Sequence, residues 1–164
     1  MSEAKGEHDI DETDPWRDEA QGWDRDPVVV AYADAAFASL LAAVPVSERA
    51  RVLDFGCGTG LLSERLAPLC AEVIAVDASA AMIDVLRAKS LPKVRPAVAR
   101  WTPENIAADP LAAEPFDLIV CSSVCAFLED YPGVAAMLAS RLAPGGHFVQ
   151  WDWEYSPDAD PPFG

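Results

Sequence analysis

A short apolar segment that runs directly into three alternating glycines constrains this chain more than any other feature. Residues 51–55 are predicted to form a strand, and Gly56, Gly58 and Gly60 follow it. Glycine adopts left-handed backbone angles readily and has no Cβ atom, so its backbone can approach a ligand closely. A helix is predicted over residues 59–69. The turn would therefore direct backbone N–H groups and a helix N-terminus at whatever lies above the sheet edge.

A carboxylate ends the next predicted strand. Residues 72–76 form a second apolar run, and Asp77 follows it, roughly 20 residues past the glycine turn. An acid at this place accepts hydrogen bonds from both ribose hydroxyls of an adenosine-containing ligand. The glycine spacing differs from the Gly-x-Gly-x-x-Gly pattern of dinucleotide-binding proteins. No Gly-Lys-Ser/Thr sequence follows the turn, so a P-loop is also excluded.

Four segments, taken in order, resemble the motifs of the class I S-adenosylmethionine-dependent methyltransferases. Residues 54–60 carry an acid followed by three alternating glycines, and residues 73–82 carry Asp77 at the end of the second strand. Residues 116–123 resemble the fourth strand of that family, and residues 142–149 resemble the turn into its fifth strand. The resemblance covers about residues 27–155, and it implies that the chain uses S-adenosylmethionine as its cofactor.

The resemblance also implies a role for each residue of these motifs. The glycine loop would hold the methionyl part of the cofactor, Asp77 the ribose, and the residues after it the adenine. Asp54 would order the loop or reach the methionyl ammonium through water. Tyr32 matches a tyrosine near the methionyl carboxylate in many members, although packing is the commoner role on such a helix. The implied cofactor-binding residues are Asp54, Gly56, Cys57, Gly58, Gly60, Asp77, Ala78, Met82, Ala99, Arg100, Trp101, Cys121, Ser122 and Tyr32.

The segment after the third predicted strand departs from the family pattern. The family often has an aspartate there that accepts a hydrogen bond from the adenine amino group, whereas this chain has Arg100, which has no acceptor. Either backbone groups of residues 99–101 and stacking on Trp101 recognise the adenine, or Trp101 is a packing residue. After the fourth strand, Cys121 and Ser122 are expected to flank the path between cofactor and methyl acceptor.

Helices and strands are predicted to alternate along most of the chain. Helices are expected over residues 28–44, 59–69, 79–89, 103–108 and 132–143, and strands over residues 51–55, 72–76, 94–99, 116–121 and 146–153. This alternation predicts a single α/β domain with a Rossmann-like, doubly wound and mostly parallel sheet. The turns after the first, second and fourth strands would then surround one pocket.

The composition divides the chain into four parts. Residues 1–26 are acidic and are expected to be disordered or loosely docked, and residues 27–50 to form a capping N-terminal helix. Residues 51–155 are expected to bind S-adenosylmethionine, and residues 156–164 to form a tail. The family fold continues past its fifth strand, so this fold is expected to be C-terminally shortened. The fifth strand, with Trp151 and Trp153, would then be an exposed edge through which the chain forms a homodimer.

Charge and composition narrow the function further. The net charge is −15, and most of it lies at the two ends of the chain. An acidic surface repels phosphate backbones, which argues against a nucleic acid as substrate. The chain has no apolar run long enough for a membrane span and no signal-peptide pattern at its N-terminus, so a cytoplasmic protein is expected. The four cysteines form no C-x-x-C pair and are expected to be reduced, and no metal site is predicted.

Two functional hypotheses follow. The first is a methyltransferase that transfers a methyl group in line to a small molecule and releases S-adenosylhomocysteine. The second is a non-catalytic cofactor-binding or regulatory module of the same fold. In-line transfer needs positioning more than proton transfer, so no catalytic residue is assigned, although His147, Glu129 or Asp130 would be the candidates for a general base. An apolar lid of Trp16, Trp23 and Tyr32 would suit a small acceptor.

Overall fold

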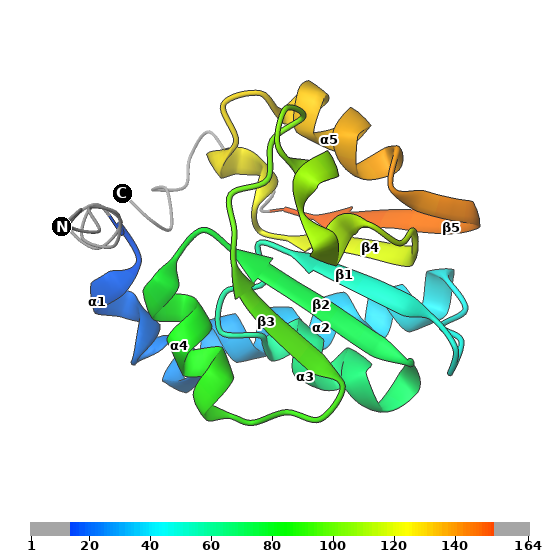
Figure 1. Cartoon of the computed structure of the whole chain (residues 1–164). Coiled ribbons are helices and arrows are strands. Elements are labelled where there is room, and N and C mark those ends of the chain that lie inside the picture. Colours follow the sequence, from blue (N-terminus) through cyan, green and yellow to red (C-terminus); the bar gives the residue numbers. More distant parts are fainter. Residues whose placement is uncertain (1–13, 153–164) are drawn as a thin grey trace, which may run out of the picture.

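The computed structural model describes residues 14–152, and a parallel sheet organises them. The strands are paired in the order β3-β2-β1-β4-β5, and every pair is parallel (Figure 1). Chain order therefore reverses between β1 and β4, which is the topology of a doubly wound sheet. The predicted Rossmann-like α/β architecture is confirmed. The strands are β1 Arg51–Phe55, β2 Glu72–Asp77, β3 Val94–Val98, β4 Phe116–Ser122 and β5 Leu142–Trp151.

Helices cover both faces of this sheet (Figure 1). On one face, buried residues of three α-helices pack against the sheet, and on the other face α5 packs together with two 3-10 turns. The first face carries α2 Pro27–Ala43, α3 Leu61–Leu66 and α4 Ala80–Ala88. The second carries α5 Tyr131–Ala139 with η3 Ile106–Ala108 and η4 Pro110–Ala112. The remaining elements are α1 Arg17–Ala20, η1 Trp23–Arg25, η2 Ala67–Leu69 and η5 Cys125–Phe127.

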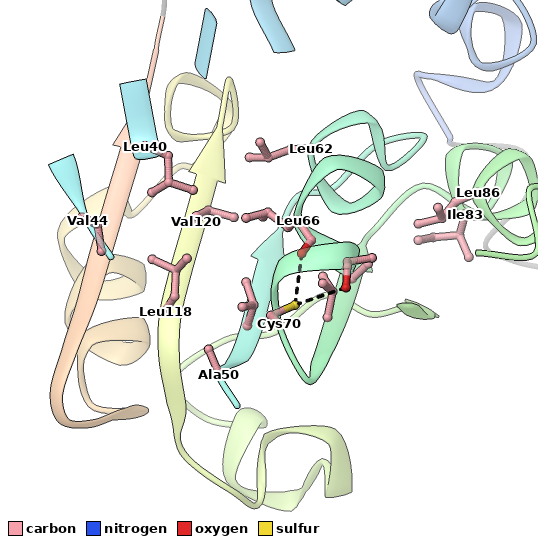
Figure 2. Packing of buried hydrophobic residues seen from close by; sticks show 14 residues of the cluster. Leu40, Val44, Ala50, Leu62, Leu66, Cys70, Ile83, Leu86, Leu118 and Val120 are labelled. Atoms are coloured by element: carbon pink, nitrogen blue, oxygen red, sulfur yellow. Dashed lines mark hydrogen bonds between the residues drawn. The ribbon is translucent and has the colours of Figure 1, made fainter. Parts of the chain in front are cut away.

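The alternation of side chains along each strand divides the core in two. In β1, Val52 belongs to the cluster that includes residues of α2 and α3, whereas its neighbour Leu53 belongs to the cluster under α5. Figure 2 shows residues of the first cluster, among them Leu40 of α2, Leu66 of α3 and Leu118 of β4. In β4, Leu118 and Ile119 divide in the same way. Both faces of the central strands are thus covered by apolar side chains, which is typical of parallel sheets.

Polar side chains mark the starts of the helices. The Asp26 carboxylate accepts a hydrogen bond from Val28 N at 2.8 Å, and Pro27 occupies the first turn of α2. The Ser79 hydroxyl accepts one from Met82 N at 3.1 Å at the start of α4. The Ser79 cap fixes where α4 begins after the carboxyl end of β2.

Several predicted boundaries differ from the structure for local reasons. The helix after β1 begins at Leu61, not at residue 59, because Gly60 lies in the left-handed region with φ 80°. The helix expected over residues 103–108 is only the turn η3, in a segment bounded by Pro103 and Pro110. α5 ends at Ala139, and β5 already begins at Leu142 through a register shift against β4.

β5 forms one edge of the described sheet, as expected. Its Trp151 contacts the core beside α2, and the indole N–H donates to the Ser39 hydroxyl at 2.7 Å. Trp153 lies outside the described residues, and dimerisation through this edge stays a prediction. Within residues 14–152, no helix combines the length and the apolar character that crossing a membrane would require.

The left-handed glycine that begins α3 gives a first test of this fold. Gly60→Ala places a Cβ atom on a backbone with φ 80° and against the Leu86 side chain. We expect the free energy of unfolding to fall by about 1–2 kcal/mol in urea titrations, because left-handed angles are unfavourable for residues with a Cβ atom. Gly22→Ala is the matched control, because Gly22 has φ −95° and its added Cβ would meet no heavy atom closer than 3.7 Å. Equal losses in both variants would contradict this interpretation.

Candidate functional site

A cavity of about 850 Å³ opens at the carboxyl ends of the strands. The turns after β1, β2, β3 and β4 line it from the sheet side, and residues of α1, η1 and α2 line it from the other. Its volume lies within the range of small-molecule and cofactor sites. Twelve of the fourteen residues predicted to bind a cofactor line this cavity, namely Tyr32, Asp54, Gly56, Cys57, Gly58, Asp77, Ala78, Met82, Ala99, Arg100, Trp101 and Ser122.

The three glycines of the loop after β1 serve different purposes. All have positive φ angles, and the loop is fixed to the next strand by hydrogen bonds from Gly56 N and Cys57 N to the Val76 carbonyl at 2.8 and 3.0 Å. A Cβ atom on Gly56 would overlap the Val124 side chain. A Cβ atom on Gly58 would meet nothing closer than a methionine sulfur at 4.0 Å, so it would project into the cavity itself.

Gly60 and Cys121 lie outside the cavity, contrary to the prediction. Gly60 packs against Leu86 of α4 and allows the left-handed start of α3, so its role is in the fold. Cys121 is only 1% exposed and belongs to the core under α5, because β4 directs alternate side chains to opposite faces. Its neighbour Ser122 does reach the cavity. All four cysteines are free thiols, as expected.

Asp77 joins the turns after β1 and β2. Its Oδ2 atom accepts a hydrogen bond from Gly58 N, and its Oδ1 atom accepts one from Ser79 N, both at 2.8 Å. Burial raises the pKa of Asp77, and these two backbone hydrogen bonds partly oppose the rise. A carboxylate has about four acceptor positions. Asp77 therefore keeps acceptor capacity for a ligand while it holds the loop in place.

Asp54 lies in the floor of the cavity and is almost fully buried, at 1% exposure. Its Oδ2 atom accepts a hydrogen bond from the Ser63 hydroxyl at 2.6 Å, which anchors the carboxyl group to α3. Burial raises the pKa of Asp54 to about 6, and the nearby charge of Asp77 adds to the rise. Burial of a carboxylate lowers the stability of the fold. A buried acid at a ligand cavity is therefore typical of a functional site.

The segment after β3 forms a side wall of the cavity. Ala99 N donates to the Asp77 carbonyl at 2.9 Å, so this wall continues the sheet beside the acid. Trp101 is 5% exposed, and its indole N–H donates to the Asp109 carboxylate at 2.7 Å. Trp101 therefore borders the cavity while its ring is packed in the core, and stacking of an adenine on it stays a prediction.

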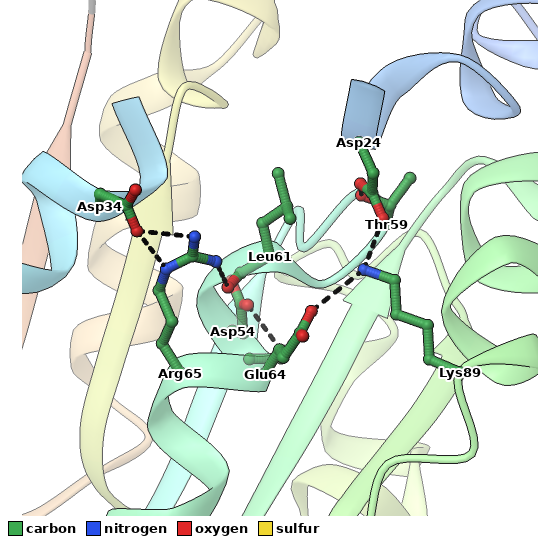
Figure 3. Close-up of polar contacts among 9 residues, drawn as sticks. Asp24, Asp34, Asp54, Thr59, Leu61, Glu64, Arg65 and Lys89 are labelled. Atoms are coloured by element: carbon green, nitrogen blue, oxygen red, sulfur yellow. Dashed lines mark hydrogen bonds and ion pairs between the residues drawn. The ribbon is translucent and has the colours of Figure 1, made fainter. Parts of the chain in front are cut away.

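The roof of the cavity comes from the N-terminal strap, defined here as residues 14–26. The Asp24 carboxylate accepts a hydrogen bond from the Thr59 hydroxyl at 2.5 Å and pairs with Lys89 at 2.7 Å, as Figure 3 shows. The Asp14 carboxylate accepts hydrogen bonds from the Ser79 hydroxyl at 2.8 Å and from Ala81 N at 3.2 Å. Residues 1–26 were expected to be disordered or loosely docked. The described part is instead fixed at both ends.

Aromatic side chains of the strap lie over the cavity. Trp16 makes edge-to-face contacts with Trp23 and with Phe127 of η5, with ring centroids 5.6 and 5.3 Å apart. Both tryptophans and Tyr32 line the cavity, where the sequence placed a lid. Phe127 was not predicted to line the cavity. The one signal in the sequence is that this aromatic residue follows the fourth predicted strand, whose end was expected at the pocket.

Residues 53–148 match the protein family described as Methyltransferase domain. This match covers more than half of the 164 residues. The chain belongs to the methyltransferase domain family.

Curated relatives of this methyltransferase domain share about a third of the aligned residues. An uncharacterized methyltransferase of Schizosaccharomyces pombe is 33% identical over 108 residues, which is 62% of this chain and 38% of the relative. The ubiquinone biosynthesis O-methyltransferase of Marinobacter nauticus is 37% identical over 98 residues, which is 59% of this chain and 41% of the relative. The aligned part thus spans about two fifths of these curated relatives.

Solved structures support the same family. The methyltransferase domain aligns with DhpI, in a complex described with SAM and HEP, at a TM-score of 0.66 and 27% identity, over 84% of this chain and 62% of DhpI. It aligns with the N-methyltransferase NodS of Bradyrhizobium japonicum, in complex with S-adenosyl-L-homocysteine, at a TM-score of 0.62 and 29% identity. That alignment covers 86% of this chain and 67% of NodS.

The raised pKa of Asp54 predicts a pH dependence of stability. An acid whose pKa rises from 3.8 to about 6 on folding binds more protons in the native state between these values. Stability is therefore lost as pH rises from about 4 to 6, by about 3 kcal/mol in full. We expect Asp54→Asn, which keeps an acceptor for Ser63, to remove this loss in urea titrations between pH 4 and 7.

The control for this titration is Asp84→Asn. Asp84 is an exposed acid on α4 that pairs with Arg87 at 3.2 Å. The Asp84→Asn variant should show the same pH dependence of the unfolding free energy as the wild type. Asp77 also has a raised pKa and is retained in both variants, so the comparison isolates Asp54. A constant difference in unfolding free energy between Asp54→Asn and wild type across this range would contradict the prediction.

Proposed function

We propose that this chain is an S-adenosylmethionine-dependent methyltransferase that acts on a small molecule and releases S-adenosylhomocysteine. The observation that carries the proposal is the arrangement of Gly58 and Asp77, in which a bare glycine backbone and a strand-end carboxylate meet at one cavity. The family membership supports it, as do the names of the relatives and the cofactor products held by the structural neighbours.

The residues of the cavity fit this cofactor. Asp77 keeps acceptor positions that suit ribose hydroxyls, and the open space at Gly58 leaves room that any side chain would fill. In our proposal Ala78, Met82 and the wall formed by residues 99–101 contact the adenine, and all of these residues line the cavity. Arg100 cannot accept a hydrogen bond from an adenine amino group, so backbone groups of this wall take that role in our proposal.

The chemistry asks little of the protein. The cofactor supplies a methyl group already activated by a sulfonium leaving group. The chain then has to bind the two reactants, align them and exclude water, which accounts for much of the rate in such reactions. The strap and the wall after β4 enclose the cavity for this purpose.

No residue is assigned as a general base. His147 lies in β5, where it pairs with Leu118 and does not line the cavity. The Asp130 carboxylate accepts a hydrogen bond from Gly133 N at 3.0 Å and caps α5, and Glu129 does not line the cavity either. None of the three candidates considered from the sequence is among the described residues that line the cavity.

We propose a small molecule as the acceptor for two reasons. The cavity is bounded by the strap on one side and by the sheet on the other, which limits the size of what enters. The net charge of −15 opposes the approach of a nucleic-acid backbone.

Calorimetric titration tests the cofactor site directly. We expect S-adenosylmethionine and S-adenosylhomocysteine to bind with micromolar affinity, and NAD to bind far more weakly because the glycine spacing differs from the dinucleotide pattern. Asp77→Asn should weaken binding of the first two by about 10- to 100-fold, since hydrogen bonds to a charged group are lost.

Asp84→Asn serves as the matched control, because it removes an exposed acid of α4 outside the cavity. It should bind both ligands as the wild type does. Equal affinity for NAD, or unchanged binding by Asp77→Asn, would overturn the proposal. Cofactor binding without methyl transfer in a broad acceptor screen would instead favour the non-catalytic module.

A further inference from the structure

Aromatic rings of the strap and of η5 line one part of the cavity. We define the aromatic roof as Trp16, Trp23 and Phe127, which join the strap to η5 through edge-to-face contacts. Tyr32 of α2 lines the same cavity. Phe127 is 56% exposed, although it is a large apolar side chain at the rim of a cavity. Rings arranged in this way offer both apolar area and the negative faces of their π systems.

The charged side chains that line the cavity are mostly acidic. Among the described residues that line the cavity, the acids are Glu19, Asp54 and Asp77, and the one cation is Arg100. Arg100 follows Ala99, whose backbone N–H donates to the Asp77 carbonyl, so it belongs to the side wall that we assign to the nucleoside. Neither the strap nor η5 contributes a lysine or arginine to the described lining.

Glu19 lies next to the aromatic roof. It lies three residues after Trp16, and Ala20 N donates to the Trp16 carbonyl at 3.0 Å, so the backbone between them is helical. Residues three apart on a helix share one face. The Glu19 carboxylate and the Trp16 ring therefore lie on the same side of α1, and both line the cavity.

Resting on the proposed function, we propose that the methyl acceptor is a small amine with an apolar body, whose cationic nitrogen is recognised by Glu19 and the aromatic roof. Aromatic faces attract cations, and a neighbouring carboxylate adds to that attraction. An anionic acceptor would meet Glu19, and no lysine or arginine of the strap or η5 is among the described residues that line the cavity. The proposal concerns recognition of the amine and assigns no atom of the acceptor as the one that is methylated.

Matched probes test this inference on the full chain saturated with S-adenosylhomocysteine. The probes are 3-phenylpropan-1-amine, 3-phenylpropan-1-ol and 3-phenylpropionate, which share a three-carbon chain on a phenyl ring and differ in charge. We expect the amine to bind about 10-fold more tightly than the carboxylate in calorimetric or NMR titrations, with the alcohol between them. Glu19→Gln should weaken amine binding about 3- to 5-fold and leave the affinity for the alcohol unchanged.

Glu48→Gln is the control variant, because Glu48 is an exposed acid in the loop before β1 and does not line the cavity. It should change none of these affinities. Tighter binding of the carboxylate, equal loss of amine and alcohol binding in Glu19→Gln, or no binding of any probe would overturn the inference. Failure of the wild-type chain to bind S-adenosylhomocysteine would overturn the proposed function itself, and this is measured first.

Discussion

The rest of the site depends on the two backbone hydrogen bonds that Asp77 accepts. One comes from Gly58 N and the other from Ser79 N, so a single carboxylate joins the turn after β1 to the turn after β2. The N-terminal strap is attached to the same two turns, because Asp24 binds Thr59, next to Gly58, and Asp14 binds the Ser79 hydroxyl. The glycine loop and the start of α4 therefore meet at Asp77, and the roof of the cavity is attached to the same two turns through Asp14 and Asp24.

This arrangement places acids where burial makes their charge unfavourable. The pKa values of Asp54 and Asp77 are both raised, and the desolvation of the carboxyl groups is the main cause. A ligand with positive charge in the cavity would offset that cost, because it favours the ionised form of both groups. The sulfonium and ammonium groups of the proposed cofactor meet this requirement, and an amine under the aromatic roof would add a second positive charge beside Glu19. The positive charge of the proposed cofactor would thus stabilise the same buried acids whose charge is unfavourable in the cavity.

Local patterns in the sequence predicted much of this. The alternation of apolar runs depends on neighbours along the chain and predicted the doubly wound sheet. The glycine spacing and Asp77 at a strand end indicated a nucleotide site, and the resemblance to the methyltransferase family supplied most of the residues predicted to line it. Contacts between distant residues could not be predicted in this way. Asp24 and Thr59 are 35 positions apart, so composition alone made the strap seem loose. Cys121 was misplaced because the face that a strand residue occupies depends on the register of its neighbours.

The central claim is that the turn joined by Asp77 forms the site of an adenosyl cofactor. A crystal structure of the chain with S-adenosylhomocysteine tests it most directly. The account predicts ribose hydroxyls within hydrogen-bonding distance of the Asp77 carboxylate and ligand atoms in the open space beside Gly58, under the strap. A ligand bound elsewhere, or bound in this cavity without contact to Asp77, would contradict it.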